Sequence, residues 1–285
     1  MFDIFHYSFV LRGLEAGMLI ALIAPLIGIF LVLRRYALIA DTLSHVSLAG
    51  VAIGLIAGIN PLITAIVAST VASVAIERLR LTKRVYGETA LALFLSGSLA
   101  VAIVLIGLAH GFNADLFSYL FGSIVTVKQT DLVIIALFSL IILAVIPAFY
   151  KELVYISFDE EAARVSGLPT NFINTLFIII ASVTVALAIP IIGVLLISAL
   201  IVIPVVTALQ LKKNFWQTIL WAQAISVASV LLGIVISFYE NLSPGGTIVL
   251  IMLVIFTLVF LTHRGAALER LPTFLTRSRA GSARE

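Results

Sequence analysis

The sequence predicts an all-α protein, a polytopic integral membrane bundle of about nine transmembrane helices. Of its 285 residues, 62% are hydrophobic and 11% are charged, with a mean hydropathy of +1.24, whereas soluble domains carry roughly 25% charged residues. The apolar residues fall in long stretches that match the thickness of a bilayer core. The basic residues lie almost entirely on one side of those stretches. No soluble fold has enough interior to bury such a chain.

Nine apolar stretches have the length of a membrane-spanning helix. Asn60-Pro61 and Ile189-Pro190 read as tight turns that split two longer runs into hairpins, each proline lying in the first turn of the next helix. No polar block or flexible linker divides the chain, so we expect one transmembrane domain over residues 1–262 and a tail over 263–285. The predicted spans are 13–33, 40–59, 61–80, 88–109, 131–150, 171–188, 190–211, 215–238 and 246–262.

The distribution of charge predicts an N-terminus outside the cell and a C-terminus inside. With nine spans, only Arg12 and Lys128 of the 17 basic residues remain outside, which is the positive-inside pattern. Eight spans would put Lys212 and Lys213, or the tail, on the wrong side, so nine is favoured. We expect residues 263–285 to form a frayed cytoplasmic tail, with attraction to anionic membrane lipid as the alternative.

The chain contains no cysteine, which excludes disulfides and thiolate metal sites. Any metal ligand must therefore come from histidine, carboxylate or backbone oxygen. The opening residues MFDIFHYSF lack the basic region and small-residue cleavage site of a secretory signal. We therefore expect the first apolar stretch to remain in the mature protein.

Small and helix-breaking residues in the spans indicate how the helices pack. Gly50, Gly54 and Gly58 recur at intervals of four and make a smooth strip where another helix approaches closely, either from this chain or from a second copy. Pro204 removes one backbone hydrogen bond from the seventh span, so we expect a kink there.

Asp41 and His45 form a polar pair at the cytoplasmic side of the second span. Their spacing of four residues places both side chains on one helix face. A charged group inside a membrane-spanning helix usually faces a protein interior or a water-filled path. The alternative is that Asp41 caps the second helix and His45 merely pairs with it. A cap alone does not explain a histidine one turn deeper on the same face.

A carboxylate beside an imidazole suits Zn²⁺, Mn²⁺ and Fe²⁺, whereas Cu⁺ prefers sulfur. Two ligands from one chain are too few for a tight site. Twofold association of two chains would bring two Asp41 and two His45 side chains to one axis, enough for a transient tetrahedral site. A site on a transport path should also release its ion readily.

Residues 157–169, SFDEEAARVSGLP, predict a short cytoplasmic helix. Ser157 or Asp159 can cap its start, and Glu160 and Glu161 lie in the first turn, where the helix dipole favours them. Gly167 followed by Leu168-Pro169 stops it. A helix this short needs a docking surface, which is either the inner face of the protein itself or a groove on a cytoplasmic partner.

Six segments, in this order, resemble the permease subunits of ATP-binding-cassette importers for zinc, manganese and iron, the ABC-3 metal-transport permeases. They are LRRYALIADTLSHVSLAGVAIG (33–54), GETALALFLS (87–96), LFGSI (120–124), SFDEEAARVSGLP (157–169), IPIIGVLLISALIVIPVVTAL (189–209) and SPGGTIVL (243–250). The resemblance covers roughly residues 12–262. Two departures are mild: the acidic pair usual near the fourth span is Gly87-Glu88 here, and glycine replaces a commoner alanine in residues 243–246.

The resemblance implies a multi-pass cell-membrane permease that works as a homodimer, with a pair of cytoplasmic ATPase subunits and an extracytoplasmic metal-binding protein. It implies no nucleic-acid partner and no permanently bound cofactor. It assigns the metal pair to Asp41 and His45. It assigns ATPase coupling to the helix from Asp159 to Gly167, with Glu160, Glu161, Ala162 and Ala163 in its turns. The transported ion stays open among zinc, manganese and iron.

Rival functions are also open on the sequence alone. The chain lacks a G-x-x-x-x-G-K-[ST] phosphate-binding loop, so ATP hydrolysis would belong to a partner and the chain would be no enzyme. A metal-coupled secondary transporter would use Asp41 and His45 without any ATPase. An importer of a chelate such as haem or cobalamin would need a wide cavity and no metal pair. An intramembrane metalloenzyme would need a third strong ligand, and H-E-x-x-H is absent.

Overall fold

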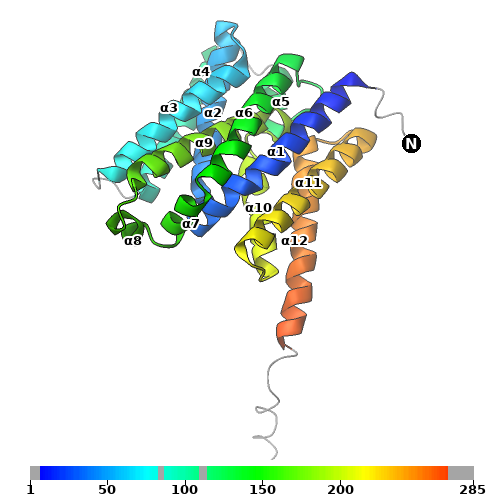
Figure 1. Ribbon diagram of the computed structural model, residues 1–285. Coiled ribbons are helices and arrows are strands. Elements are labelled where there is room, and N and C mark those ends of the chain that lie inside the picture. Colours follow the sequence, from blue (N-terminus) through cyan, green and yellow to red (C-terminus); the bar gives the residue numbers. More distant parts are fainter. Residues whose placement is uncertain (1–6, 83–86, 109–113, 269–285) are drawn as a thin grey trace, which may run out of the picture.

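The computed structural model describes residues 7–82, 87–108 and 114–268. All regular elements in these ranges are helices, which confirms the predicted all-α class (Figure 1). Eight helices are long and apolar enough to cross a membrane: α1 (Ser8–Leu33), α2 (Ala37–Ala57), α3 (Pro61–Leu81), α4 (Gly87–Leu108), α6 (Gln129–Ala148), α9 (Thr170–Ile192), α11 (Phe215–Glu240) and α12 (Pro244–Leu268). The shorter ones are α5 (Ala114–Phe121), α7 (Tyr150–Phe158), α8 (Glu160–Val165) and α10 (Ile197–Gln210).

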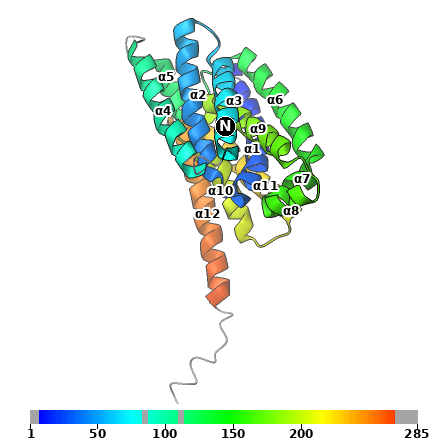
Figure 2. The same ribbon diagram turned by 90° about the vertical axis from the view of Figure 1, so that its left-hand side faces the viewer.

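The two ends of the bundle differ in chemistry. At the arginine end, the residues Arg34, Arg80, Glu160 and Asn174 join α1, α3, α8 and α9 by hydrogen bonds. At the glycine end, the backbones of α5, α9 and α12 approach one another at three glycines. Figure 1 shows α7 and α8 together at one end of the bundle, and Figures 1 and 2 show α12 extending beyond the other helices.

The turn between α2 and α3 confirms the hairpin predicted at Asn60-Pro61. Asn60 caps α3 by accepting a hydrogen bond from the Leu62 N–H at 2.8 Å, and Pro61 is the first residue of the helix. The Asn60 amide also donates to the buried Asp131 carboxylate at 2.9 Å. Asp131 accepts from the Lys128 backbone N–H as well. This carboxylate therefore ties the α2–α3 turn to the start of α6.

The turn predicted at Ile189-Pro190 is wrong, because Pro190 lies inside α9 and the helix continues to Ile192. The helix stops at Gly193, whose φ of +86° lies in the left-handed region that favours glycine. The Pro190 carbonyl accepts a hydrogen bond from the Ser123 N–H at 2.9 Å. This bond satisfies a carbonyl that the end of the helix at Ile192 leaves without a helical donor. The glycine, not the proline, was the stop signal.

Residues 193–211 nevertheless form a ninth pass between the two ends. Gly193 lies at the glycine end, whereas Phe215, which starts α11, packs against Phe30 near the arginine end at a ring separation of 5.8 Å. The chain must therefore cross the bundle between them. α10 supplies the helical part of this pass with 14 residues, and Pro204 lies inside it. The predicted span 190–211 thus exists as a pass but not as a full-length helix.

Backbone contacts at the glycine end hold the start of this ninth pass. Val194 and Leu195 donate from their backbone N–H groups to the carbonyls of Tyr119 and Leu120, at 3.0 and 3.3 Å. A Cβ added to Gly193 would collide with the Leu120 carbonyl oxygen. A Cβ on Gly122 or on Gly245 would likewise collide with carbonyl oxygens near the end of α9. The glycine end therefore brings together three of the segments that carry the family resemblance: LFGSI, the segment beginning at Ile189, and SPGGTIVL.

The glycines of α2 have two different roles. A Cβ on Gly50 would lie 2.7 Å from the Thr64 carbonyl oxygen, and one on Gly54 would lie 2.8 Å from Pro61 Cα. Both glycines therefore let α3 of the same chain approach α2 closely. Gly58 has open space around its Cα and instead ends α2, with a φ of +67°.

The predicted cytoplasmic tail at 263–285 falls mostly beyond the described part of the chain. α12 continues past residue 262 to Leu268. Residues 269–285 lie outside the described residues.

We predict that Gly193→Ala destabilises the protein by about 2 kcal/mol or more, because the new Cβ combines an unfavourable φ with a backbone collision. The apparent melting temperature of the purified protein in detergent should fall by roughly 5 °C. Gly97→Ala is the control, since Gly97 lies inside α4 with no atom within 4 Å of an added Cβ. It should be neutral or slightly stabilising. Equal melting temperatures for both variants would contradict this account of the glycine end.

Candidate functional site

Asp41 and His45 share one face of α2, as their spacing predicted. The His45 Nε2 atom lies 4.0 Å from Asp41 Oδ1, and the side chains are 14% and 36% exposed. α2 begins at Ala37 and its N-cap is Tyr36. Asp41 therefore lies within the helix, and the alternative that it caps α2 is wrong. At 1.5 Å per residue, His45 lies about 12 Å along the helix from Ala37.

One ring nitrogen of His45 has no hydrogen-bond partner in the described part of the chain. This atom is Nδ1, which is buried, and leaving it unpaired costs roughly 1–3 kcal/mol. No group of three or more His, Asp or Glu side chains in the described ranges could hold a metal ion. The pair is therefore an incomplete ligand set, with one imidazole and one carboxylate available to a cation that has further ligands elsewhere.

The predicted helix after the fifth span is present as α8, preceded by the separate helix α7. Asp159 caps α8, its Oδ1 accepting from the Ala162 N–H at 2.9 Å. Ser157, the other candidate cap, lies inside α7 and donates to the Leu153 carbonyl. Gly167, with a φ of +88°, ends the helix together with a hydrogen bond from the Leu168 N–H to the Ala163 carbonyl. This is a Schellman motif, so both ends of α8 are closed by the chain itself.

The side chains of α8 divide into an inner and an outer set. Ala163 is fully buried and faces the protein's own helices. Glu161 is exposed, Ala162 is half-buried, and Val165 is 89% exposed at the end of the helix. Phe158, just before α8, is also largely exposed. The outer face therefore presents two apolar side chains beside an acidic one.

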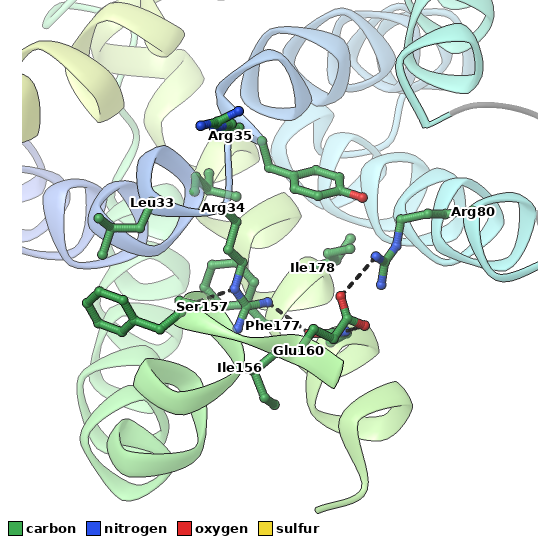
Figure 3. Close-up of a pocket in the computed structure, with 13 residues that line it drawn as sticks. Leu33, Arg34, Arg35, Arg80, Ile156, Ser157, Glu160, Phe177 and Ile178 are labelled. Atoms are coloured by element: carbon green, nitrogen blue, oxygen red, sulfur yellow. Dashed lines mark hydrogen bonds and ion pairs between the residues drawn. The ribbon is translucent and has the colours of Figure 1, made fainter. Parts of the chain in front are cut away.

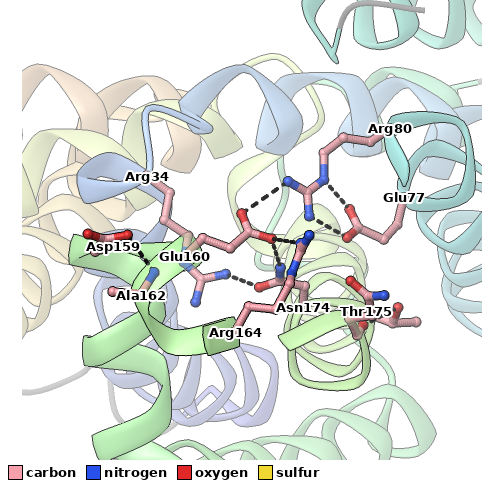
Figure 4. Close-up of polar contacts among 10 residues, drawn as sticks. Arg34, Glu77, Arg80, Asp159, Glu160, Ala162, Arg164, Asn174 and Thr175 are labelled. Carbon is pink, nitrogen blue, oxygen red and sulfur yellow. Dashed lines mark hydrogen bonds and ion pairs between the residues drawn. The ribbon is translucent and has the colours of Figure 1, made fainter. Parts of the chain in front are cut away.

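Glu160 belongs to a polar network that joins α8 to three membrane helices (Figure 4). Its Oε1 accepts from the Asn174 amide of α9 at 2.8 Å, and its Oε2 accepts from Arg80 of α3 at 3.4 Å. The Asn174 Oδ1 accepts from Arg34 at 2.9 Å, and Arg34 also donates to Ser157 at 2.9 Å. Both α7 and α8 are thus fastened to the bundle by charged hydrogen bonds.

Arg34 is the C-cap residue of α1 and connects that helix to the network. Burial lowers the pKa of its guanidinium to about 10, and the neighbouring Glu160 carboxylate partly opposes that shift. Its guanidinium carbon also lies 4.8 Å from the centre of the Phe177 ring. Arg34 therefore remains charged at neutral pH and is held by both polar and aromatic partners.

A pocket of about 250 Å³ lies between α8 and the corner that joins α1 to α2. Arg34, Arg35, Arg80, Ser157 and Glu160 line it, together with apolar residues (Figure 3). α8 is therefore not close-packed against the bundle on this side.

Sequence reasoning missed most of this network. The charge pattern identifies Arg34 and Arg80 only as cations expected on the cytoplasmic side, and it assigns no role to Glu77, the buried partner of Arg80. A signal for Glu77 existed: an acid three residues before an arginine inside an apolar span is expensive unless the two are paired. Asn174 carried no comparable signal, because its partners lie far away in the sequence.

Comparison with known proteins supports the resemblance. The chain matches the ABC 3 transport family over residues 6–263. It is 40% identical to a probable metal transport system membrane protein of Treponema pallidum, covering 92% of this chain and 98% of that one. It is 33% identical to the manganese import system permease protein ScaB of Streptococcus gordonii, over 89% and 91% of the two chains. It is 28% identical to the high-affinity zinc uptake system membrane protein ZnuB of Haemophilus influenzae, over 88% and 97%.

A solved structure also matches the whole architecture. PsaBC from Streptococcus pneumoniae, in complex with Fab, superposes with a TM-score of 0.81 at 31% identity, covering 90% of this chain and 93% of that one. The family match spans the entire helical bundle, including α2 with its polar pair and α8 with its caps. The chain therefore belongs to the ABC 3 transport family.

Proposed function

We propose that this chain is the membrane permease subunit of an ATP-binding-cassette importer that carries a divalent transition metal into the cytoplasm. The observation that carries the proposal is the Asp41–His45 pair on one face of a membrane helix, in a chain whose relatives are named for manganese and zinc transport. An imidazole and a carboxylate accept manganese, zinc and iron alike. The cargo is therefore one of these ions, with manganese and zinc favoured by the relatives.

The incomplete ligand set supports a homodimer. One chain offers two metal donors, and Asp41 remains 36% exposed, accessible to an ion held also by a second chain. Two copies related by a twofold axis would supply four donors, enough for tetrahedral coordination. The ion is cargo, so a site of exchangeable oxygen and nitrogen ligands fits better than a tight structural site.

The charge distribution supports a cytoplasmic arginine end. Arg34, Arg80, Lys212 and Lys213 lie at or next to helix ends there, whereas Arg12 and Lys128 lie toward the other end. By the positive-inside rule, this supports an N-terminus outside and α7, α8 and the end of α12 inside. α8 is consequently on the side where a cytoplasmic ATPase would dock, and the glycine end faces an extracytoplasmic metal-binding protein.

The outer face of α8 supports its role in coupling. A preformed helix that presents Glu161, Val165 and the neighbouring Phe158 fits a groove on an ATPase subunit. Ala163 faces inward, so its part in coupling is to seat α8 on the bundle. In this arrangement the chain provides the route across the membrane and the Asp41–His45 pair, and ATP hydrolysis takes place on the ATPase subunit.

We predict that His45→Ala abolishes metal uptake. In proteoliposomes containing the permease, its ATPase and the metal-binding protein, uptake of radioactive manganese and zinc should fall at least about tenfold, because one ligand of each pair is lost. ATPase co-purification should be unchanged. Ser47→Ala is the control, since Ser47 is also buried on α2 and its hydroxyl has no partner in the described part of the chain. Normal uptake by His45→Ala would refute the site, and wild-type uptake without the ATPase would indicate a secondary transporter.

We predict that the double variant Glu161→Lys, Ala162→Arg releases the ATPase. Bulky cations on the outer face of α8 should block the groove while Asp159 still caps the helix, so the melting temperature should not change. Pull-down of the ATPase by affinity-tagged permease measures the effect. Glu152→Lys, on α7, makes a similar charge change outside α8 and should retain the ATPase. Full co-purification with the double variant would show that α8 is not the docking helix.

A further inference from the structure

Arg80 contacts three separate parts of the arginine end. Its Nε and Nη2 atoms donate to the two carboxylate oxygens of Glu77, at 2.9 and 2.7 Å. Its Nη1 donates to Glu160 Oε2 of α8 at 3.4 Å. Its guanidinium carbon lies 5.7 Å from the ring centre of Tyr36. The guanidinium of Arg80 thus connects α3 to α8 and to Tyr36, the residue that precedes α2.

The contact with Glu77 fixes Arg80 to α3. Glu77 is 1% exposed, and Arg80 binds both of its oxygens. Breaking such a pair would leave a buried charge uncompensated, which is strongly unfavourable. The contact with Glu160 is longer, and Glu160 itself is one-third exposed. Glu160 is therefore the group through which a displacement of α8 reaches the Arg80 guanidinium.

The contact with Tyr36 reaches the metal helix. Tyr36 is the N-cap of α2, and Asp41 and His45 follow it on the same helix. The preceding residue, Arg35, has a φ of +59°, a conformation unusual for a residue with a side chain. α1 and α2 thus meet at a tight corner, so a displacement of Tyr36 moves the start of α2 rather than being absorbed by a loose linker.

The surroundings of α8 leave room for it to move. The pocket of about 250 Å³ separates α8 from the α1–α2 corner, and Arg80, Tyr36 and Glu160 all line it. Ala163 is the only fully buried side chain of α8. Polar contacts, not tight packing, hold the rest of the helix. Hydrogen bonds can exchange partners, whereas close-packed side chains resist displacement.

We propose that Arg80 is the positioning residue that transmits movement of α8 to α2, and so links ATP hydrolysis to the Asp41–His45 pair. This proposal rests on the proposed function. In it, the Glu160 carboxylate pulls on Arg80 when the ATPase displaces α8, and the Arg80 guanidinium shifts Tyr36 and the start of α2. Arg80 touches neither the cargo nor the ATPase in this arrangement.

The test is Glu160→Gln in the reconstituted permease–ATPase complex. Glutamine retains an oxygen acceptor for Asn174 but removes the ion pair with Arg80, and Arg80–Glu77 stays intact. We expect the number of metal ions transported per ATP hydrolysed to fall about tenfold, the scale of one lost charged hydrogen bond. ATPase binding and basal ATP hydrolysis should stay unchanged. Loss of ATPase binding would overturn the proposal, because Glu160 would then be a docking residue.

Two controls isolate the Arg80 contact. Glu152→Gln removes one negative charge from α7, and Glu152 forms no ion pair within the described ranges. Arg164→Gln breaks only the other ion pair of Glu160, at 3.7 Å on the surface. Both should change the transport-to-ATP ratio less than about twofold, because neither variant alters the Arg80–Glu160 pair. A tenfold loss in either control would overturn the assignment to Arg80.

The link from Arg80 to α2 is tested by Tyr36→Leu, which removes the ring beside the guanidinium and keeps an apolar side chain. If Glu160 and Tyr36 act through the same arginine, the double variant should lose no more coupling than the worse single variant. Multiplicative losses, or normal coupling in Tyr36→Leu, would overturn the proposal. Failure of the wild-type complex to transport metal would instead overturn the proposed function, so the two failures are distinguishable.

Discussion

Polar groups inside the membrane passes must be satisfied by the chain itself, because hydrocarbon offers no hydrogen bonds. This constraint explains why the charged side chains that join helices distant in sequence are paired within the chain and lie near helix ends. Asp131 ties the α2–α3 turn to α6, and Glu77 is bound by Arg80. Between the ends, helices pack through small residues such as Gly50 and Gly54. Against this background, the proposed metal pair differs in leaving a carboxylate, that of Asp41, partly exposed within a membrane helix.

Local sequence signals predicted the local parts of this structure well. The shared face of Asp41 and His45 follows from helical periodicity alone. The Asp159 cap and the Gly167 stop depend on residues within a few positions of each other, so their chemistry is visible in a short segment. The span count relied on apolar length together with the side on which the cations lie. Eight of the described helices have the length and composition of a span, and the residues predicted as the remaining span hold the shorter helix α10.

The failures have physical causes as well. Pro190 was expected near a helix start, yet the helix ends only at Gly193, and the Pro190 carbonyl near that end accepts from the Ser123 N–H of the segment after α5. That donor lies in another segment and is invisible locally. The polar network is similarly non-local: Arg80 and Glu160 are separated by 80 positions, and Arg34 and Asn174 by 140. Only the folded arrangement pairs them.

The closure of α8 at both ends has a consequence for assembly. A six-residue segment would be mostly unfolded in isolation, and ordering it on a partner would cost roughly 1–2 kcal/mol per residue in backbone entropy. Here the Asp159 cap, the Schellman motif and the bonds to Asn174 and Arg80 have already ordered it. A subunit that docks there, as proposed above, would meet a helix that is already formed. Its binding free energy goes into holding the complex together rather than into folding the segment.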